Sequence, residues 1–427
     1  MARRDPMFRT VRKALPEWES DGRESAVPMI VTIREAMDSL TDTRYQPNCR
    51  HVFAEVLAMA FFAILAGADE WTEVESYCLQ RREWLSRWLS LPGGIPSHDT
   101  FQRCFRIVDR DELFPVMAAV VCGIVNEAYR RIEGTAFISD RTPVTDVIAM
   151  DGKAMLGSAR ATTYAGEVRK LQMLNVWSTQ YGLCLHSEPI PEKTNEIPVS
   201  QELCRRLDIA GKVVTVDALN TQRELAEAVI SNGGHYCLAL KANRPQMLED
   251  VALYFAEPGF LAEIERSGRK WQTVDKSQSC VWTRTYWSAP DVSWQTESPQ
   301  WRGLNSFGMV ERRREDCRTG AVTVERAYYL LSFDDVELFA LCAKSHWGVE
   351  NNLHWQLDST FADDANRTAE KESAASLSVM KRFVLSLISI VKDCYKGLSM
   401  KRIRRSIGWG NGEEEFLAFL AKSGHLV

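Results

Sequence analysis

Two aspartates stand at the ends of apolar segments in the middle of the chain. Asp151 directly follows VIAM, and Asp217 directly follows VVTV. Both segments are rich in apolar and β-branched residues, which is typical of buried strands. In open α/β sheets, functional groups collect beyond the carboxyl ends of the strands. Either aspartate alone is equally explained as the cap of a turn, so the pair matters more than its members.

Polar residues recur at every fourth position in the stretch HWGVENNLHWQLDSTFADD, residues 346–364. They are His346, Glu350, His354 and Asp358. Each residue advances about 100° around an α-helix, so these four positions spread over about 120° and rise about 18 Å. They cannot all bind one ion. The zinc-binding arrangement H-E-x-x-H is also absent, and a metal site within this helix alone is not predicted.

The helix that carries Glu350 has a clear buried face. Its apolar diagonal consists of Val349, Leu353, Leu357 and Phe361. The polar diagonal is offset from it by one residue and therefore lies at the edge of the buried face. A carboxylate side chain at that edge can point into a cleft beside a sheet. We expect Glu350 to join the two strand-end aspartates there.

Three carboxylates within a few ångströms repel one another and need cations to compensate them. Oxygen ligands with open positions suit Mg²⁺ or Mn²⁺, which keep waters and accept phosphate oxygens. Two such ions about 3.5–4 Å apart stabilise the attacking and leaving oxygens of an in-line displacement at phosphorus. The residues thus predict cleavage or transfer of a phosphodiester.

The elements that position these residues alternate between strands and helices. Three strands, VIAMDGK, LQMLNVWS and LCLHSEPI, come first after residue 142. The helix TNEIPVSQELCRRL, the strand KVVTVDAL, the helix TQRELAEAVISNGG and the strand HYCLALK follow. This order predicts a mixed α/β sheet with helices on its faces.

The flanking regions have a different texture. Residues up to about 31 are polar and Arg-rich, and a helical pattern then continues to about residue 133, with a capped helix after Ser97. Residues 245–332 contain five of the thirteen tryptophans among alternating segments, which favours β-structure. The tryptophans are expected to pack in a β-rich core, with stacking on unpaired bases as the alternative.

Composition narrows the class of protein. The net charge of −5 argues against a protein that coats nucleic acid. Basic clusters at Arg312–Arg314 and Lys401–Arg405 leave a local basic groove open, with solvated faces as the alternative. The longest apolar run, Val56–Ala68, is shorter than the roughly 20 residues that a membrane span needs, and no secretory signal is recognised. We expect a cytoplasmic protein without membrane contact.

Several blocks together resemble a known family, the H-repeat-associated branch of bacterial insertion-sequence transposases. These are DDE enzymes with an RNase H-like fold. The likeness runs from about Met37 to about Lys392. Its blocks are LAMAFFAILAGADEW, IAMDGKAMLGS, EKTNEIP, VVTVDALNTQRELAEAVISNGGHYCLALKANR and HWGVENNLHWQLDSTFADD.

The resemblance implies a function. Asp151, Asp217 and Glu350 would be the catalytic triad and would hold two Mg²⁺ or Mn²⁺ ions. The enzyme would nick double-stranded DNA at the transposon ends and then join the freed 3′ hydroxyl to target DNA. A homodimer on DNA is expected because two ends must be handled together, and the site of action would be the cytoplasm at the nucleoid.

Eight further residues fall in or beside the family motifs as DNA-binding or supporting groups. They are Lys153, Lys241, Arg244, Lys344, His346, Asn351, His354 and Asp358. Lys153 and Lys241 would steady DNA phosphates or be ordinary strand-end lysines. The two histidines would orient Glu350 or touch DNA.

The expected organisation has five segments. They are a flexible N-terminal arm (1–30), a helical N-terminal domain with possible DNA binding (31–140), the first part of an RNase H-like α/β core (141–244), a β-rich insertion domain (245–333), and the second part of the core with C-terminal helices (334–427).

The chain departs from the family pattern at Leu156, Ala242, Arg244, Ser359 and Asp363, where arginine, glycine, glutamine, valine and glutamate are usual. No triad member is lost. The departures keep two alternatives open: a diverged or recruited relative that binds DNA without transposing it, and a metal-dependent DNA nuclease.

Overall fold

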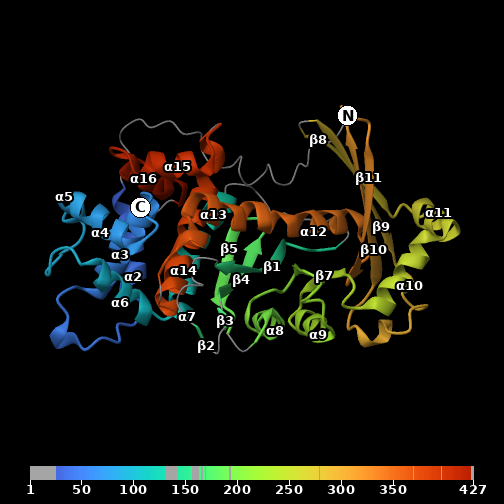
Figure 1. Cartoon of the computed structure of the whole chain (residues 1–427), viewed down its shortest axis with the longest axis horizontal. Helices are drawn as coiled ribbons and strands as arrows, with labels where there is room; N and C mark the ends of the chain where they lie inside the picture. The colour runs from blue at the N-terminus through green and yellow to red at the C-terminus, as the bar shows by residue number, and fades with distance from the viewer. Residues whose placement is uncertain are drawn as a thin grey trace.

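The computed structural model describes residues 26–130, 142–155, 163–164, 167–168, 170–191, 194–277, 279–368, 370–395 and 397–424. Figure 1 shows an elongated molecule with a helical bundle at one end, a sheet in the middle and a ribbon of long strands at the other end. Most of the arm expected over 1–30 lies outside the described residues. Its end is helical, because α2 already begins at Val27.

One mixed sheet runs through the molecule, in the strand order β5-β4-β1-β6-β7-β11-β10-β9-β8. β1 pairs antiparallel with β4 and parallel with β6, and β6 pairs parallel with β7. The predicted mixed α/β, RNase H-like architecture is therefore confirmed. The strands are β1 (Asp146–Met155), β4 (Leu171–Ser178), β5 (Leu183–Pro189), β6 (Lys212–Val216), β7 (His235–Leu240), β8 (Lys270–Ser277), β9 (Cys280–Ala289), β10 (Ser306–Asp316) and β11 (Val322–Leu331), with β2 (Thr163–Tyr164) and β3 (Glu167–Val168) in a separate pair.

Helices cover the two faces of this sheet. α8 (Glu196–Arg206) and α9 (Arg223–Ser231) lie on one side, and α12 (Val336–Val349) lies on the other (Figure 1). Residues alternate between the faces along β1: Ile148 and Met150 pack in the core under α8 and α9, while Ala149 packs in the core on the other face. This alternation decides which side chains meet just beyond Met150, where the pairing of β1 with β6 ends.

The insertion extends the central sheet. Its last strand, β11, pairs antiparallel with β7, so the core strands and the insertion strands share one hydrogen-bonded ladder. The insertion also starts with two helices, α10 (Pro245–Ala256) and α11 (Pro258–Arg266), each with a proline in its first turn. The expectation of β-structure from residue 245 is therefore wrong for this part.

The tryptophans of the insertion divide into two groups. Trp287 and Trp301 are buried, and Trp294 stacks on the ring of Tyr254 with 4.8 Å between ring centroids. These three tryptophans therefore pack inside the protein, as expected. Trp271 is 38% exposed on β8 and belongs to the ribbon surface.

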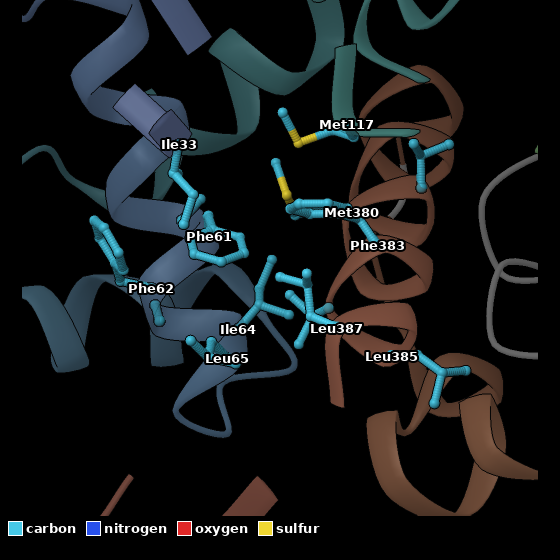
Figure 2. Close-up of a cluster of buried hydrophobic side chains, with 14 of the residues drawn as sticks. Ile33, Phe61, Phe62, Ile64, Leu65, Met117, Met380, Phe383, Leu385 and Leu387 are labelled. Atoms are coloured by element: carbon cyan, nitrogen blue, oxygen red, sulfur yellow. The ribbon is translucent and has the colours of Figure 1, made fainter. Parts of the chain in front are cut away.

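The helical bundle is built from both ends of the chain around one apolar core. In Figure 2, Phe61 and Ile64 of α3 face Met380, Phe383 and Leu387 of α14. The same core includes residues of the sheet face that α14 covers. The predicted N-terminal domain and the C-terminal helices therefore share one core and are not separate units.

The remaining helices complete this end of the molecule. They are α2 (Val27–Asp38), α3 (Phe53–Leu65), α4 (Trp71–Gln80), α5 (Arg82–Leu85), α6 (His98–Ile107), α7 (Arg110–Arg130), α13 (Trp355–Phe361), α14 (Lys371–Val391), α15 (Met400–Ile407) and α16 (Gly412–Gly424), with short 3₁₀ turns at Gln46–Asn48, Asp363–Ala365 and Lys392–Cys394. A further 3₁₀ turn, Ser298–Gln300, lies in the insertion between β9 and β10.

Two sequence signals have structural explanations in this bundle. α14 is long and apolar enough to cross a membrane, but 94% of its apolar window is buried inside the protein, as expected of a core helix. Within the basic run on α15, Arg404 is buried and donates to the carbonyl oxygens of Ile64 and Ala68. That arginine caps the end of α3 and does not contribute to a basic surface.

Candidate active site

Asp151 and Asp217 lie side by side. Met150 of β1 is paired with Val216 of β6 in parallel register, and Asp151 and Asp217 are the next residues, where this parallel pairing ends. Only Asp217 follows the end of its strand, because β1 continues to Met155 and Asp151 remains paired with Asn175 of β4. Neighbouring strands are about 4.8 Å apart. The structure therefore brings together the pair that the strand pattern predicted.

Glu350 reaches this edge from a π-helix. The segment Glu350–His354 has π geometry and joins α12 to α13, where we expected one continuous α-helix. π-turns of this kind are rare and concentrate at functional sites. Leu353 and Leu357 are still fully buried, so the apolar diagonal is confirmed as the core face. The Glu350 side chain is 65% exposed and projects from the helix edge.

Three side chains converge closely enough to share an ion. One ligand atom from each of Asp151, Glu350 and His354 lies within 4.8 Å of the other two. His354 Nδ1 is 3.1 Å from Glu350 Oε2 and 3.6 Å from Asp151 Oδ2. Asp217 lies beside this group and lines the same cleft.

Buried hydrogen bonds fix the tautomer of His354. The Asn175 Oδ1 atom accepts from Arg382 Nε at 2.6 Å and from Ser187 Oγ at 2.9 Å, so the amide nitrogen must face His354 Nε2, 3.2 Å away. The Nε2 atom thus accepts, and Nδ1 carries the proton towards Glu350. Burial lowers the pKa of His354 to about 4, so the ring is neutral at pH 7.

The site accumulates negative charge. Burial, together with the nearby carboxylates of Glu196, Asp217 and Glu350, raises the pKa of Asp151 to about 7. Glu196 was not predicted as a site residue. It follows the cap residue Asn195 at the start of α8, where an acidic side chain is ordinary, and only its place in the block EKTNEIP gave a signal.

A buried amide links two of these carboxylates. Asn220 Nδ2 donates to Asp217 Oδ1 at 2.9 Å and to Glu196 Oε2 at 3.0 Å. The backbone N–H of Asn220 donates to the same Asp217 oxygen at 3.1 Å. Asp217 is therefore oriented by the loop that follows its own strand.

His346 stands apart from His354. It lies one turn before Glu350, on α12, lines the cleft and interacts electrostatically with Asp217, while burial lowers its pKa. Its Nδ1 atom is buried without a hydrogen-bond partner among the described residues. The two histidines thus serve different carboxylates, whereas we expected both beside Glu350.

Lys153 points inward. Its side chain is 6% exposed, and its Nζ atom is 2.6 Å from Asp358 Oδ1 and 3.2 Å from Asp364 Oδ1. An ammonium group held in this way is not presented to a DNA phosphate, contrary to the role expected for this lysine. Asp358 correspondingly forms an ion pair with this lysine, while its side chain is still 35% exposed.

The other predicted residues surround the cleft or lie near it. Lys241 is exposed and lines the cleft. Arg244 donates to Gln222 Oε1 at 2.8 Å, and its guanidinium lies 5.5 Å from the ring centroid of Trp301. Lys344 and Asn351 are exposed on the helix that carries Glu350. Leu156, the departure that concerned a DNA contact, lies outside the described residues.

The cleft is lined by both acidic and basic side chains. Its volume is 710 Å³. The lining includes the carboxylates of Asp151, Asp217 and Glu350 and the basic groups of Lys241, Arg312 and Arg326, of which Arg326 is paired with Glu311. Anionic phosphates suit the basic groups. They are tolerated beside the carboxylates only with cations between them.

The donor set fits divalent metal ions. Carboxylate oxygens from three different elements, with one side chain largely exposed, provide hard ligands and leave positions open for water and phosphate. In the described part of the chain, no lysine or arginine forms an ion pair with Asp151, Asp217 or Glu350. An added cation is therefore the simplest way to balance the site.

Comparison with known proteins agrees with this geometry. Residues 142–387, more than half of the chain, match the family model described as a transposase DDE domain, and residues 34–132 match its associated N-terminal region. The "Uncharacterized protein in dhlA 3'region" of Xanthobacter autotrophicus is 32% identical over 68% of this chain and 90% of that protein. The "H repeat-associated putative transposase YhhI" of Escherichia coli K12 is 26% identical over 86% of this chain and 93% of that protein. The chain belongs to the family of DDE transposases.

Proposed function

We propose that Asp151, Asp217 and Glu350 form the catalytic triad and hold two divalent ions, Mg²⁺ or Mn²⁺. The observation that carries this proposal is the convergence of three carboxylates from β1, β6 and the π-helix without a balancing lysine or arginine in the described chain. When bound, the ions would activate the attacking oxygen and stabilise the leaving oxygen of an in-line displacement.

The chain's own residues position this chemistry. His354 donates its Nδ1 proton to Glu350 and holds that carboxylate towards Asp151. Asn175 and the buried Arg382 hold the histidine in turn. Lys241 and Arg312, which line the same cleft, would bind phosphates of the DNA backbone.

The substrate that fits this cleft is double-stranded DNA. In the first step, water would attack a phosphodiester at the transposon end and release a 3′ hydroxyl. In the second step, that hydroxyl would attack a phosphodiester of target DNA; the new bond would join it to the target 5′ phosphate, and the 3′ oxygen on the other side of the bond would leave as a free 3′ hydroxyl. A homodimer on DNA in the bacterial cytoplasm, at the nucleoid, completes the proposal because both ends must be cut together.

A nicking and joining assay tests the triad. The purified chain with Mg²⁺ should nick DNA that carries the ends of its own element and join them to plasmid DNA. Asp151→Asn, Asp217→Asn and Glu350→Gln should each abolish both products. Glu337→Gln, an exposed carboxylate at the start of the same α12 helix, is the matched control and should retain both. Full activity in any triad variant would refute the assignment.

The same assay separates the alternatives. A nuclease would release cut DNA without joined products, and a relative that only binds DNA would give neither product. The complete set of converging carboxylates favours a catalytic protein over one that only binds DNA.

A further inference from the structure

We propose that Glu196 is a fourth acidic member of this active site, a positioning residue that acts on Asp217 and on the metal-binding edge of β1. This inference rests on the proposed triad. It concerns a residue of α8, on the opposite face of the sheet from Glu350, so the site would be closed from both faces.

The first observation is the space above Gly152. The side chains of Asp151 and Gly152 alternate, so Asp151 leaves β1 on the α12 face and position 152 faces α8. A Cβ atom built on Gly152 would lie 1.9 Å from Glu196 Oε1 and 2.5 Å from its carboxyl carbon. The Glu196 carboxylate therefore occupies the place of a side chain at 152, directly beside the first aspartate of the triad.

The second observation is the buried amide between Glu196 and Asp217. Asn220 is 1% exposed, and its Oδ1 accepts from Ser200 Oγ at 3.0 Å. This contact directs Nδ2 towards both carboxylates, where it donates to Glu196 Oε2 and Asp217 Oδ1. Two side chains that are themselves almost fully buried thus fix the relative position of Glu196 and Asp217.

A purely structural role explains this arrangement less well. An acidic residue in the first turn of α8 stabilises the helix from a solvent-exposed position. Glu196 turns back over the sheet and approaches two other carboxylates, which costs free energy unless a cation is shared. Residues that orient metal ligands commonly change metal affinity when they are replaced.

Metal binding by the full chain without DNA tests the proposal. Calorimetric titration with MnCl₂ should show affinity about 10-fold or more weaker for Glu196→Ala, with Glu196→Gln between it and the wild type, because replacing residues that orient metal ligands costs roughly 10–100-fold. Glu202→Gln, an exposed carboxylate on the same helix, is the matched control and should bind as the wild type does. In strand transfer, kcat should fall with the KM for DNA unchanged, and Glu196→Asp should recover part of it.

Gly152 supplies a second variant that does not depend on removing the carboxylate. Gly152→Ala should displace Glu196 and weaken Mn²⁺ binding to a similar degree. The double variant Gly152→Ala/Glu196→Ala should then bind no more weakly than Glu196→Ala alone, because both changes remove the same contribution. Additive losses would contradict the link between the two residues.

These measurements distinguish failure of the role proposed for Glu196 from failure of the proposed triad. Wild-type Mn²⁺ affinity and kcat in both Glu196→Ala and Glu196→Gln would overturn the role of Glu196 and leave the triad intact. Wild-type affinity in Asp151→Asn as well would overturn the proposed function itself.

Discussion

Two groups of charged side chains lie close together, and they are balanced differently. Beneath α14, Arg382 and Asp363 are both fully buried and 3.4 Å apart. On β1, the buried ammonium group of Lys153 is held by the partly exposed carboxylates of Asp358 and Asp364. At the edge of β1 and β6, three carboxylates converge without a lysine or arginine partner in the described chain.

A group of converging carboxylates without a lysine or arginine of its own therefore indicates a site that binds a cation from solution. Unpaired charges near one another cost several kcal/mol in a protein interior. In the first group, Arg382 and Lys153 supply the positive charge that balances the carboxylates. In the active site, that positive charge must come from a bound cation. A neutral histidine, His354, stands between the two groups and contacts both through Asn175 and Glu350.

The largest expected effect is on catalysis. Loss of any triad carboxylate should lower the rate of strand transfer by roughly a thousandfold or more, because bound divalent ions contribute several kcal/mol and each ~1.4 kcal/mol is tenfold. Single-turnover joining rates of Asp217→Asn and the wild type at saturating Mg²⁺ measure this. A loss below tenfold would mean that the unbalanced carboxylates are not the catalytic centre.

The next effect is on stability in the balanced group. Arg382→Met should lower the free energy of unfolding by about 3–5 kcal/mol, because it leaves Asp363 buried without its cation. Urea unfolding monitored by circular dichroism measures this loss. Arg402→Met, an exposed arginine on α15, should change stability by less than about 0.5 kcal/mol. Equal stability of the two variants would show that the buried pair is not needed.

Added metal should then stabilise only the unbalanced group. Mn²⁺ at a hundred times its dissociation constant should raise the free energy of unfolding by about 2.7 kcal/mol. The same concentration should leave Asp151→Asn unchanged. Thermal unfolding with and without MnCl₂ makes the comparison, and equal shifts in both proteins would place the bound ion elsewhere.

The smallest expected effect is a rise in the free energy of unfolding, whereas replacing a buried charged residue usually lowers it. The pKa of Asp151 is about 7 in the folded chain against 3.8 unfolded. The protonated carboxyl therefore favours folding at low pH, and this contribution is lost as pH rises from about 4 to about 7. Without metal, Asp151→Asn should be more stable than the wild type at pH 8, by on the order of 1–3 kcal/mol.

This stabilisation should vanish at pH 4, whereas Asp363→Asn should be destabilising at pH 8 because it removes the partner of the buried Arg382. Melting temperatures of the three proteins from pH 4 to pH 8 in EDTA check the signs. An Asp151→Asn variant that is less stable than the wild type at pH 8 would remove the contrast between the two groups.

Local pattern was enough to predict the strands that carry Asp151 and Asp217 and the apolar face beside Glu350, but not that β1 continues past Asp151 to Met155. Strand and helix periodicity is encoded in neighbouring residues, so β1, β6 and the face of Leu353 and Leu357 follow from it. The helical start of the insertion was not predicted, because the tryptophans and alternating segments that favour β-structure were taken to represent the whole insertion. Residues 245–266 instead form two helices that begin at prolines.

Other features depend on contacts between distant segments. Glu196 has the sequence context of an ordinary first-turn acid, and only folding brings it over Gly152. Arg382 and Asn175 look like surface residues by type, yet both are fully buried. The π-turn after Val349 has no residue signature, and the inward turn of Lys153 follows from the acids of a distant segment.

The pairing of β11 with β7 has a consequence for any attempt to isolate the catalytic half of the chain. Strand β7 has β6 on one side and β11 on the other. Excising residues 245–333 would turn β7 into an open edge with unpaired N–H and C=O groups, which other chains can join. An isolated catalytic core would therefore have to keep the insertion strands β8 to β11 to avoid aggregation through β7.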